Sequence, residues 1–261
     1  MIDDMAIKNT KALPIFMHDP ATNAILREVR AAVPKGSRLY LIGGAARNAL
    51  YFRMFGERMR QRDYDVIIMG GGALAFIRNL RAKGFIYGKI RRKEQIVLKK
   101  KKILHPQSIS DYVVLDIHTV CHEKTIQENL RKHVNFTVNG FVLPFSVITS
   151  SEWYKKIIAL PTALPDLKVK QLRVNVNQHP ADLFACMRFM SKGFRPPPKA
   201  EVQILLQGLS RIQKWRFQKN VPKLLDYVGG EKNARQLLKR LGITQNIFDF
   251  RVVKSLVGRS L

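Results

Sequence analysis

Apolar residues in the first half of the chain follow two spacings, one typical of helices and one typical of strands. Helical spacing predicts helices over 22–33, 45–55 and 73–82. Short apolar runs bounded by glycines or polar residues predict strands over 39–42, 65–69, 85–90, 94–101 and 111–120. This alternation of strands and helices predicts a sheet with helices packed against it.

The second half of the chain has helical spacing almost throughout. It predicts helices over 180–192, 199–217, 221–228, 231–241 and 245–256, with the rigid Pro196–Pro198 segment between the first two. We therefore expect an α+β protein in which a mixed-sheet domain is followed by an all-α region. The expected divisions are 1–145 for the sheet domain, 146–177 for a linking β segment and 178–261 for the helices.

Charge narrows the choice of partner. The chain has 46 Lys and Arg residues against 19 Asp and Glu, a net charge of +27, and a 46% hydrophobic fraction that is ordinary for a globular protein. Lysines and arginines that neutralise phosphates release bound counterions, so this excess favours a nucleic-acid partner over a membrane surface. No signal peptide or run of about 20 apolar residues is evident, and Cys121 and Cys186 lack metal-site spacing. We expect a cytoplasmic protein.

Three aspartates are candidates for metal chemistry. Asp63 and Asp65 stand two apart at the head of a strand, where side chains point to the same side. Paired carboxylates repel unless a cation lies between them, although a single Asp-x-Asp is also common in solvated turns. Asp116 interrupts another apolar strand, and a third converging carboxylate is typical of sites with two metal ions. We expect His118, two residues further on, to be a structural neighbour and not a ligand.

A glycine turn before the second predicted helix is a candidate anion site. Gly43 and Gly44 allow backbone N–H groups to approach a phosphate at a helix N-terminus, and Arg47 can pair with a phosphate oxygen. The pattern fits neither the dinucleotide-binding glycine motif nor the P-loop.

These motifs resemble those of the class II tRNA CCA-adding enzymes and bacterial poly(A) polymerases, within the polymerase-β-type nucleotidyltransferases. The resemblance begins with the Gly-Gly-x-x-Arg turn and the Asp-x-Asp strand, and Asp116 matches the family's later acid. It continues at Asn135–Gly140, at Ala163–Leu167 with Leu172-Arg173, and at Arg188-Phe189, so that it covers roughly residues 38–195 in the family's order.

The resemblance implies a nucleotidyltransferase head followed by a helical neck and a short basic body. The implied activity is template-independent addition of nucleotides from ATP, CTP or both to a tRNA or other RNA 3′ end, with two Mg²⁺ ions. The implied catalytic residues are Asp63, Asp65 and Asp116, of which Asp63 and Asp65 bind the metal. The implied nucleotide-binding residues are Gly43, Gly44, Arg47, Asn139, Asp182 and Arg188.

The chain departs from the family pattern at several positions. Asn48 stands where the family usually has Asp, and Val134-Asn135 stands where it has Arg-Asp. The base-selecting charges of the family's neck helix are absent from residues 178–182. The resemblance therefore does not imply selection of C and A.

Two basic segments are candidate RNA contacts. A hairpin over the strands at 85–101 carries Lys99, Lys100, Lys101 and Lys102 together with Arg91 and Arg92, and we expect these residues to bind phosphates without sequence preference. Near the end of the 199–217 helix, Trp215 and Phe217 are interleaved with basic residues. They suit either a nucleic-acid groove or a plain helix core.

Three functions follow as hypotheses. The leading one is the RNA nucleotidyltransferase. The second is a catalytically faded RNA-binding or assembly protein that keeps the fold, suggested by the altered neck and the short tail. The third keeps the chemistry but uses a protein or a small molecule as acceptor, which the charge disfavours. The sequence indicates no protein partner.

Overall fold

A computed structural model of the chain describes residues 13–59, 61, 63–92, 95–102, 111–119, 124–176 and 179–256. The chain divides into two compact units, which we describe separately. The first unit comprises residues 1–130 and 139–160, and the second comprises 131–138 and 161–261. The division splits the expected linking segment, with residues 146–160 in the first unit and 161–177 in the second, and it assigns residues 131–138 to the second unit.

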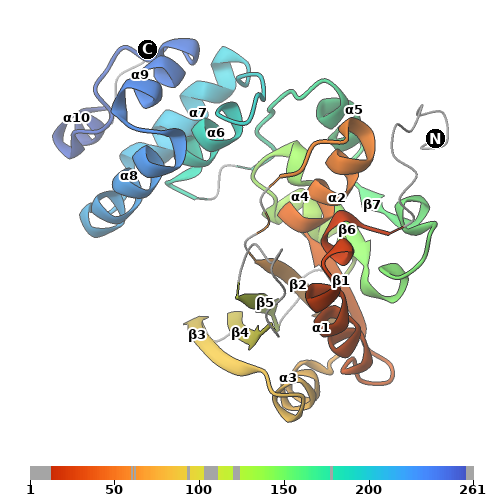
Figure 1. The fold of residues 1–261 in the computed structure, drawn as a ribbon. Coiled ribbons are helices and arrows are strands. Elements are labelled where there is room, and N and C mark those ends of the chain that lie inside the picture. The colour runs from red at the N-terminus through yellow and green to blue at the C-terminus, as the bar shows by residue number, and fades with distance from the viewer. Residues whose placement is uncertain are drawn as a thin grey trace. The chain divides into compact units, whose positions relative to one another are not determined.

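The first unit is built on one sheet of mixed direction (Figure 1). Along the described residues its strand order is β3-β4-β5-β2-β1-β6-β7. Strands β2 and β5 pair in parallel, and the other neighbours pair antiparallel. The strands are β1 (Arg38–Ile42), β2 (Tyr64–Met69), β3 (Ile86–Arg92), β4 (Gln95–Lys101), β5 (Tyr112–His118), β6 (Phe141–Pro144) and β7 (Ile158–Ala159).

Helices and alternating side chains give this sheet two different faces. The helices are α1 (Pro20–Ala31), α2 (Gly44–Phe55), α3 (Ala73–Ala82) and α4 (Ile126–His133), the last of which crosses the boundary between the units. Leu98 and Leu115 are paired across β4 and β5 and fully buried. They share their face with Lys100, whose ammonium group reaches Glu28 of α1, so this face is the one toward α1. The opposite face carries the polar side chains described below.

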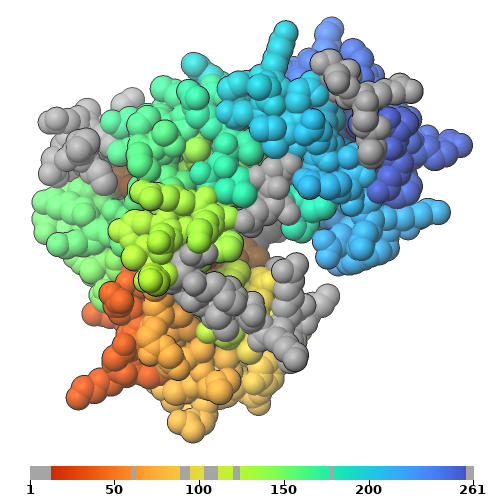
Figure 2. Space-filling model, turned by 180° about the vertical axis from the view of Figure 1, so that it is seen from behind, coloured from red at the N-terminus to blue at the C-terminus, as the bar shows by residue number. Residues whose placement is uncertain are grey.

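The second unit is helical. Its helices are α5 (Ala163–Lys168), α6 (Asp182–Met190), α7 (Lys199–Ser210), α8 (Lys214–Val228), α9 (Glu231–Arg240) and α10 (Phe250–Ser255). Helix α6 packs against α7, α8 and α9. Phe217 lies between Phe184 and Phe250, with ring centroids 6.3 Å and 5.4 Å apart. Figure 2 shows the side chains of these helices, cyan to blue, packed into one mass.

The predicted strands and most predicted helices are present, and the predicted elements that differ in extent lie in the helical half. The expected 199–217 helix ends at Ser210, and a new helix begins at Lys214. That helix, α8, continues through Pro222 to Val228, although proline is usually found in the first turn of a helix. The expected 245–256 helix is shortened to α10, and α4 was not predicted. Among the described residues, none of the helices combines the length and apolarity needed to cross a membrane.

Candidate functional site

Parallel pairing of β2 and β5 brings two carboxylates side by side. The register places Asp65 directly beside Asp116, and residues so paired point to the same face of the sheet. Asp116 is only 1% exposed. Removing an ionised carboxylate from water is costly, and a second carboxylate beside it adds repulsion. The two adjacent carboxylates therefore carry negative charge that a bound cation would offset.

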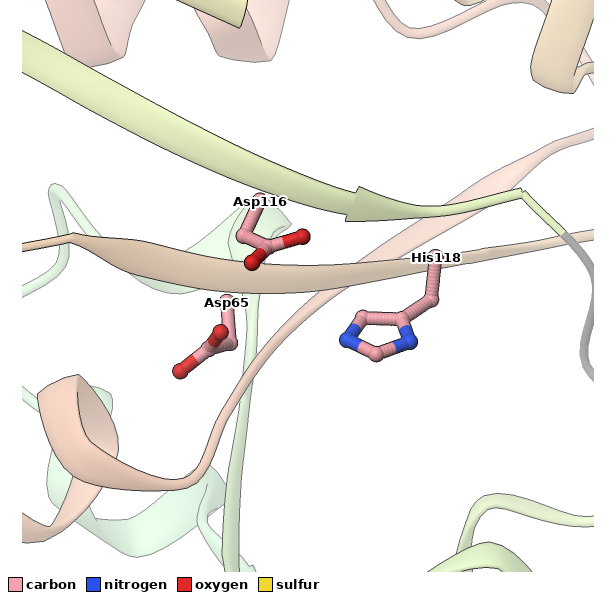
Figure 3. A group of neighbouring side chains, drawn as sticks. All are labelled: Asp65, Asp116 and His118. Carbon is pink, nitrogen blue, oxygen red and sulfur yellow. The ribbon is translucent and has the colours of Figure 1, made fainter. Parts of the chain in front are cut away.

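His118 completes a group with these two residues. It lies on the same strand and face as Asp116, and Figure 3 shows its ring directed to the side where the two carboxylates lie. One ligand atom from each of Asp65, Asp116 and His118 lies within 4.8 Å of the other two. Asp63, on the loop just before β2, is not a member of this group. Two carboxylates and one imidazole are a donor set that suits a divalent metal ion.

The β1–α2 turn approaches the same carboxylates. Gly43 has φ 63° and ψ −126°, a conformation open to glycine and very little else. A methyl group at Gly43 would lie 3.8 Å from the Asp65 Oδ2 atom. Gly44 begins α2, so the backbone N–H groups of the first helical turn start here. This side of Asp65 therefore offers donors and a favourable dipole to an anion.

Arg47 is held by a hydrogen-bond network behind this turn. Its side chain is buried, and its Nε and Nη2 atoms donate to Asn48 Oδ1 over 3.1 Å and 2.8 Å. Its Nη1 atom donates to Asn139 Oδ1. Asn48 Nδ2 in turn donates to Gln61 Oε1 over 2.9 Å, and Gln61 donates to the Asp63 carbonyl. The network joins the glycine turn to the chain that leads into β2.

The other two nucleotide-binding candidates belong to the second unit. Asp182 begins α6 and is 5% exposed. It accepts hydrogen bonds from Asn135 Nδ2 over 3.1 Å and from the His179 backbone N–H over 3.2 Å. Burial raises the pKa of Asp182 even though these donors, and the charge of Arg188 on the same helix, act to lower it. The structure thus gives Asp182 a role within its own unit, and its contact with a nucleotide stays a prediction.

The basic run on β4 is divided between the two faces of the sheet. Lys100 and Lys102 point toward α1, where they form ion pairs with Glu28 and Asp19, and Lys102 is 8% exposed. Lys99 and Lys101 point to the face that carries Asp116, with Lys99 Nζ 5.0 Å from the Tyr112 ring centroid. Of the four lysines in this run, Lys100 and Lys102 thus bind acids near α1, and a phosphate contact by Lys99 and Lys101 stays a prediction. The side chains of Arg91 and Arg92 lie outside the described residues.

Two residues of this site were not assigned to it from the sequence. His118 was expected to be a structural neighbour, although its two-residue spacing from Asp116 was a usable signal. Gln61 had no sequence signal, because its role depends on a long-range contact with Asn48. Within the Asn135–Gly140 segment, Phe136 and Val138 are both fully buried and belong to the core. Cys186 is a buried free thiol, while Cys121 lies outside the described residues.

Comparison with known proteins gives matches in structure alone. No protein-family model matches the chain, and no curated protein matches it. The Thermotoga maritima CCA-adding enzyme complexed with tRNA matches with a TM-score of 0.59 and 16% identity, over 86% of this chain and 52% of its own. A CCA-adding enzyme in complex with CTP matches with a TM-score of 0.59 and 20% identity, over 86% and 52%. A tRNA nucleotidyltransferase complexed with a primer tRNA and an incoming ATP analog matches with a TM-score of 0.59 and 18% identity, over 86% of this chain and 62% of its own.

These matches confirm the expected α+β fold, with a nucleotidyltransferase-like head and a helical body. The resemblance drawn from the motifs is thus confirmed at the level of the fold. The chain spans 52% to 62% of the length of these three solved structures.

Proposed function

We propose that this protein is a template-independent nucleotidyltransferase that adds nucleotides from a nucleoside triphosphate to an RNA 3′ end. The observation that carries the proposal is the parallel register of β2 and β5, which sets Asp65 beside the buried Asp116 next to the Gly43 turn. Carboxylates that converge beside an anion-binding turn suit a metal-bound triphosphate. The fold shared with solved CCA-adding enzymes supports the same chemistry.

Magnesium fits the donor set at the head of the sheet. Asp63 and Asp65 would hold it, and Asp116 would hold a second ion together with Asp65. When bound, the ions supply positive charge to the triphosphate and lower the pKa of the attacking hydroxyl. The buried position of Asp116 agrees with this role, because a cation offsets the cost of burying its charge.

The other site residues would position the triphosphate. Gly44 presents its backbone N–H at the start of α2, and Gly43, whose own N–H donates to the Phe141 carbonyl over 3.3 Å, allows the triphosphate to approach closely. Arg47 pairs with a phosphate oxygen. The RNA 3′-hydroxyl attacks the α-phosphorus, a P–O bond forms, and the bond to the β-phosphate breaks as pyrophosphate leaves. The carboxylates near the hydroxyl, with Asp116 foremost, stabilise its loss of a proton. Asn139 would lie beside the nucleotide sugar, oriented by its bond to Arg47.

RNA is the proposed acceptor because of the net charge of +27 and of the matched structures that contain tRNA. CTP and ATP are the proposed nucleotides because CCA-adding enzymes with this fold have been solved with each. Lys99 and Lys101 would contact the RNA backbone on the face that carries Asp116.

The test is incorporation of each labelled nucleotide into RNA in the presence of Mg²⁺. Asp65→Ala and Asp63→Ala are each expected to lower the rate by at least about 10³-fold, since both remove metal ligands. Glu152→Ala is the control, because Glu152 is an exposed acid paired with Lys155 on the surface. No incorporation by wild type, or equal incorporation by the Asp65→Ala variant, would contradict the proposal.

The catalytically faded RNA-binding protein is the second candidate. It is favoured by the hydrogen bond between Asn135 and Asp182, since this bond engages both residues within the second unit. This candidate predicts RNA binding that neither Mg²⁺ nor nucleotide changes, and that Asp65→Ala leaves intact. A labelling experiment that offers RNA and protein acceptors together separates both candidates from transfer to protein.

A further inference from the structure

His118 gives the candidate metal site a nitrogen donor. Its ring nitrogen lies within 4.8 Å of a carboxylate oxygen of both Asp65 and Asp116, and the two aspartate oxygens lie within the same distance of each other. Two ligands of one ion at about 2.1 Å each stand about 3 Å apart when adjacent, so small side-chain rotations suffice to close the set. All three side chains share one face of the sheet (Figure 3).

We propose that Asp65, Asp116 and His118 form a position selective for a divalent transition-metal ion, best filled by Mn²⁺ in preference to Mg²⁺. Mg²⁺ prefers oxygen ligands in near-ideal octahedral geometry, whereas imidazole suits transition metals. The two carboxylates suit Mn²⁺ and balance the charge of a divalent ion. Asp63 lies outside this group, so an all-oxygen position between Asp63 and Asp65 stays available to Mg²⁺.

The neighbours of His118 on the sheet suit a ligand. The strand register sets Ile67 of β2 on one side of His118 and Gln95 of β4 on the other. Ile67 is 2% exposed, so an apolar side chain flanks the ring in the direction of β2. An ordered ring on a central strand is held more firmly than one on a loop, which favours coordination over a solvated histidine. The catalytic use of this ion rests on the proposed function, but binding of the ion can be measured without nucleotide transfer.

The experiment is a titration of the full chain with Mn²⁺, followed by electron paramagnetic resonance of the free ion, in the absence of nucleotide and RNA. His118→Gln is expected to weaken Mn²⁺ binding by about tenfold or more, because it removes a ligand that Mg²⁺ does not need. In the His118→Gln variant, a lower concentration of Mg²⁺ should then suffice to displace Mn²⁺ than in wild type. His133→Gln, at the end of α4, is the matched control and should bind Mn²⁺ as wild type does.

The outcomes separate this inference from the proposed function. Equal Mn²⁺ affinity in wild type and His118→Gln overturns the inference, whether or not nucleotides are incorporated. Weakened Mn²⁺ binding in His118→Gln supports it even if no transfer activity is found. Asp116→Asn changes a second ligand of the same metal position, and this variant is expected to lose Mn²⁺ binding too. Thermal unfolding of each variant shows whether it is folded, and a folded variant with unchanged binding counts against the inference.

Discussion

Asn48 is the residue that most distinguishes this glycine turn from the pattern that it resembles. It accepts hydrogen bonds from Arg47 through Oδ1, and its Nδ2 atom donates to Gln61. A carboxylate at this position cannot donate, and its charge would neutralise the guanidinium. With Asn48, the side chain bonded to Arg47 carries no negative charge, so in the proposed function the guanidinium keeps its positive charge for the triphosphate.

Asn48→Asp is therefore expected to raise the KM for the nucleotide by about tenfold with a smaller change in kcat, since a charge-assisted contact contributes about 1.5 kcal/mol or more. Steady-state kinetics with varied nucleotide concentration measures the effect. Gln61→Ala is the comparison, because it breaks the link to Asp63 without changing the charge beside Arg47. An unchanged KM in Asn48→Asp would show that Arg47 does not bind the triphosphate.

At this same scale, the sequence could predict the acids but not the role of their neighbour. Alternation along β5 places His118 on the face of Asp116, and this is visible in the sequence. The pairing of β5 with β2 is not visible, because the two strands are far apart in the chain and no local rule decides their order in the sheet. That pairing places Asp65 beside Asp116 and brings it within 4.8 Å of His118.

At the scale of the element, β4 shows how one lysine run acquires two roles. A run of identical residues has no alternation in type, so the sequence could not show which lysines face α1. The strand geometry divides them, and the two that face α1 meet acids. In α8, two aromatic residues close in sequence also differ in burial. Trp215 is 57% exposed and Phe217 is 5% exposed, and the sequence left open whether each belongs to a core or to a nucleic-acid groove.

Lys102→Met is expected to destabilise the fold by about 2 kcal/mol, because it leaves a partly buried carboxylate without its cation. Burial acts to raise the pKa of Asp19, but the hydrogen bond and charge of Lys102, together with hydrogen bonds from Thr22 and the Ala21 backbone N–H, outweigh this, and the pKa is lowered from 3.8. The ion pair thus contributes stability above pH 3.8 that is lost as the pH falls through the lowered pKa. Urea unfolding of wild type and variant at several pH values should show a difference that shrinks in acid.

The control for this prediction is the double variant Lys99→Ala/Lys101→Ala. Both residues point away from α1, so unfolding should be nearly unchanged. In the proposed function, the same variant binds RNA more weakly and loses about two units of the slope of affinity against salt. A stability loss equal to that of Lys102→Met would contradict the division of the lysine run between two faces.

At the scale of the whole molecule, the order of the motifs was enough to predict the fold, whereas the division into units was not predictable. Residues 131–138 belong with the helices because Phe136 bridges to Val174 and the Thr137 hydroxyl donates to Asp166 over 2.6 Å. Asp166 also forms an ion pair with Arg173. The Ala163–Leu167 and Leu172-Arg173 segments, which resemble a family motif, are thus joined to each other within the second unit. These contacts join segments about 30 residues or more apart, beyond the reach of local patterns.

The net charge of +27 is spread over both units, so we expect RNA to contact the second unit as well as the first. On α8, Trp215 is followed at four-residue intervals by Lys219 and Lys223, and all three are exposed. Such residues form one stripe along a helix, about 5–6 Å apart. Exposed aromatic and basic side chains of this kind suit stacking of single-stranded bases beside the phosphate backbone.

The chain offers an internal probe for this contact, because its two tryptophans differ in exposure: Trp153 is 1% exposed and Trp215 is 57% exposed. A single-stranded oligoribonucleotide is expected to quench the fluorescence of Trp215 on binding. Trp215→Ala should weaken the affinity by about tenfold, since stacking contributes about 1–3 kcal/mol per base, and Trp215→Phe should retain most of it. If Trp215→Ala binds RNA as tightly as wild type, this face of α8 does not contact RNA, and the basic charge of the second unit acts only at long range.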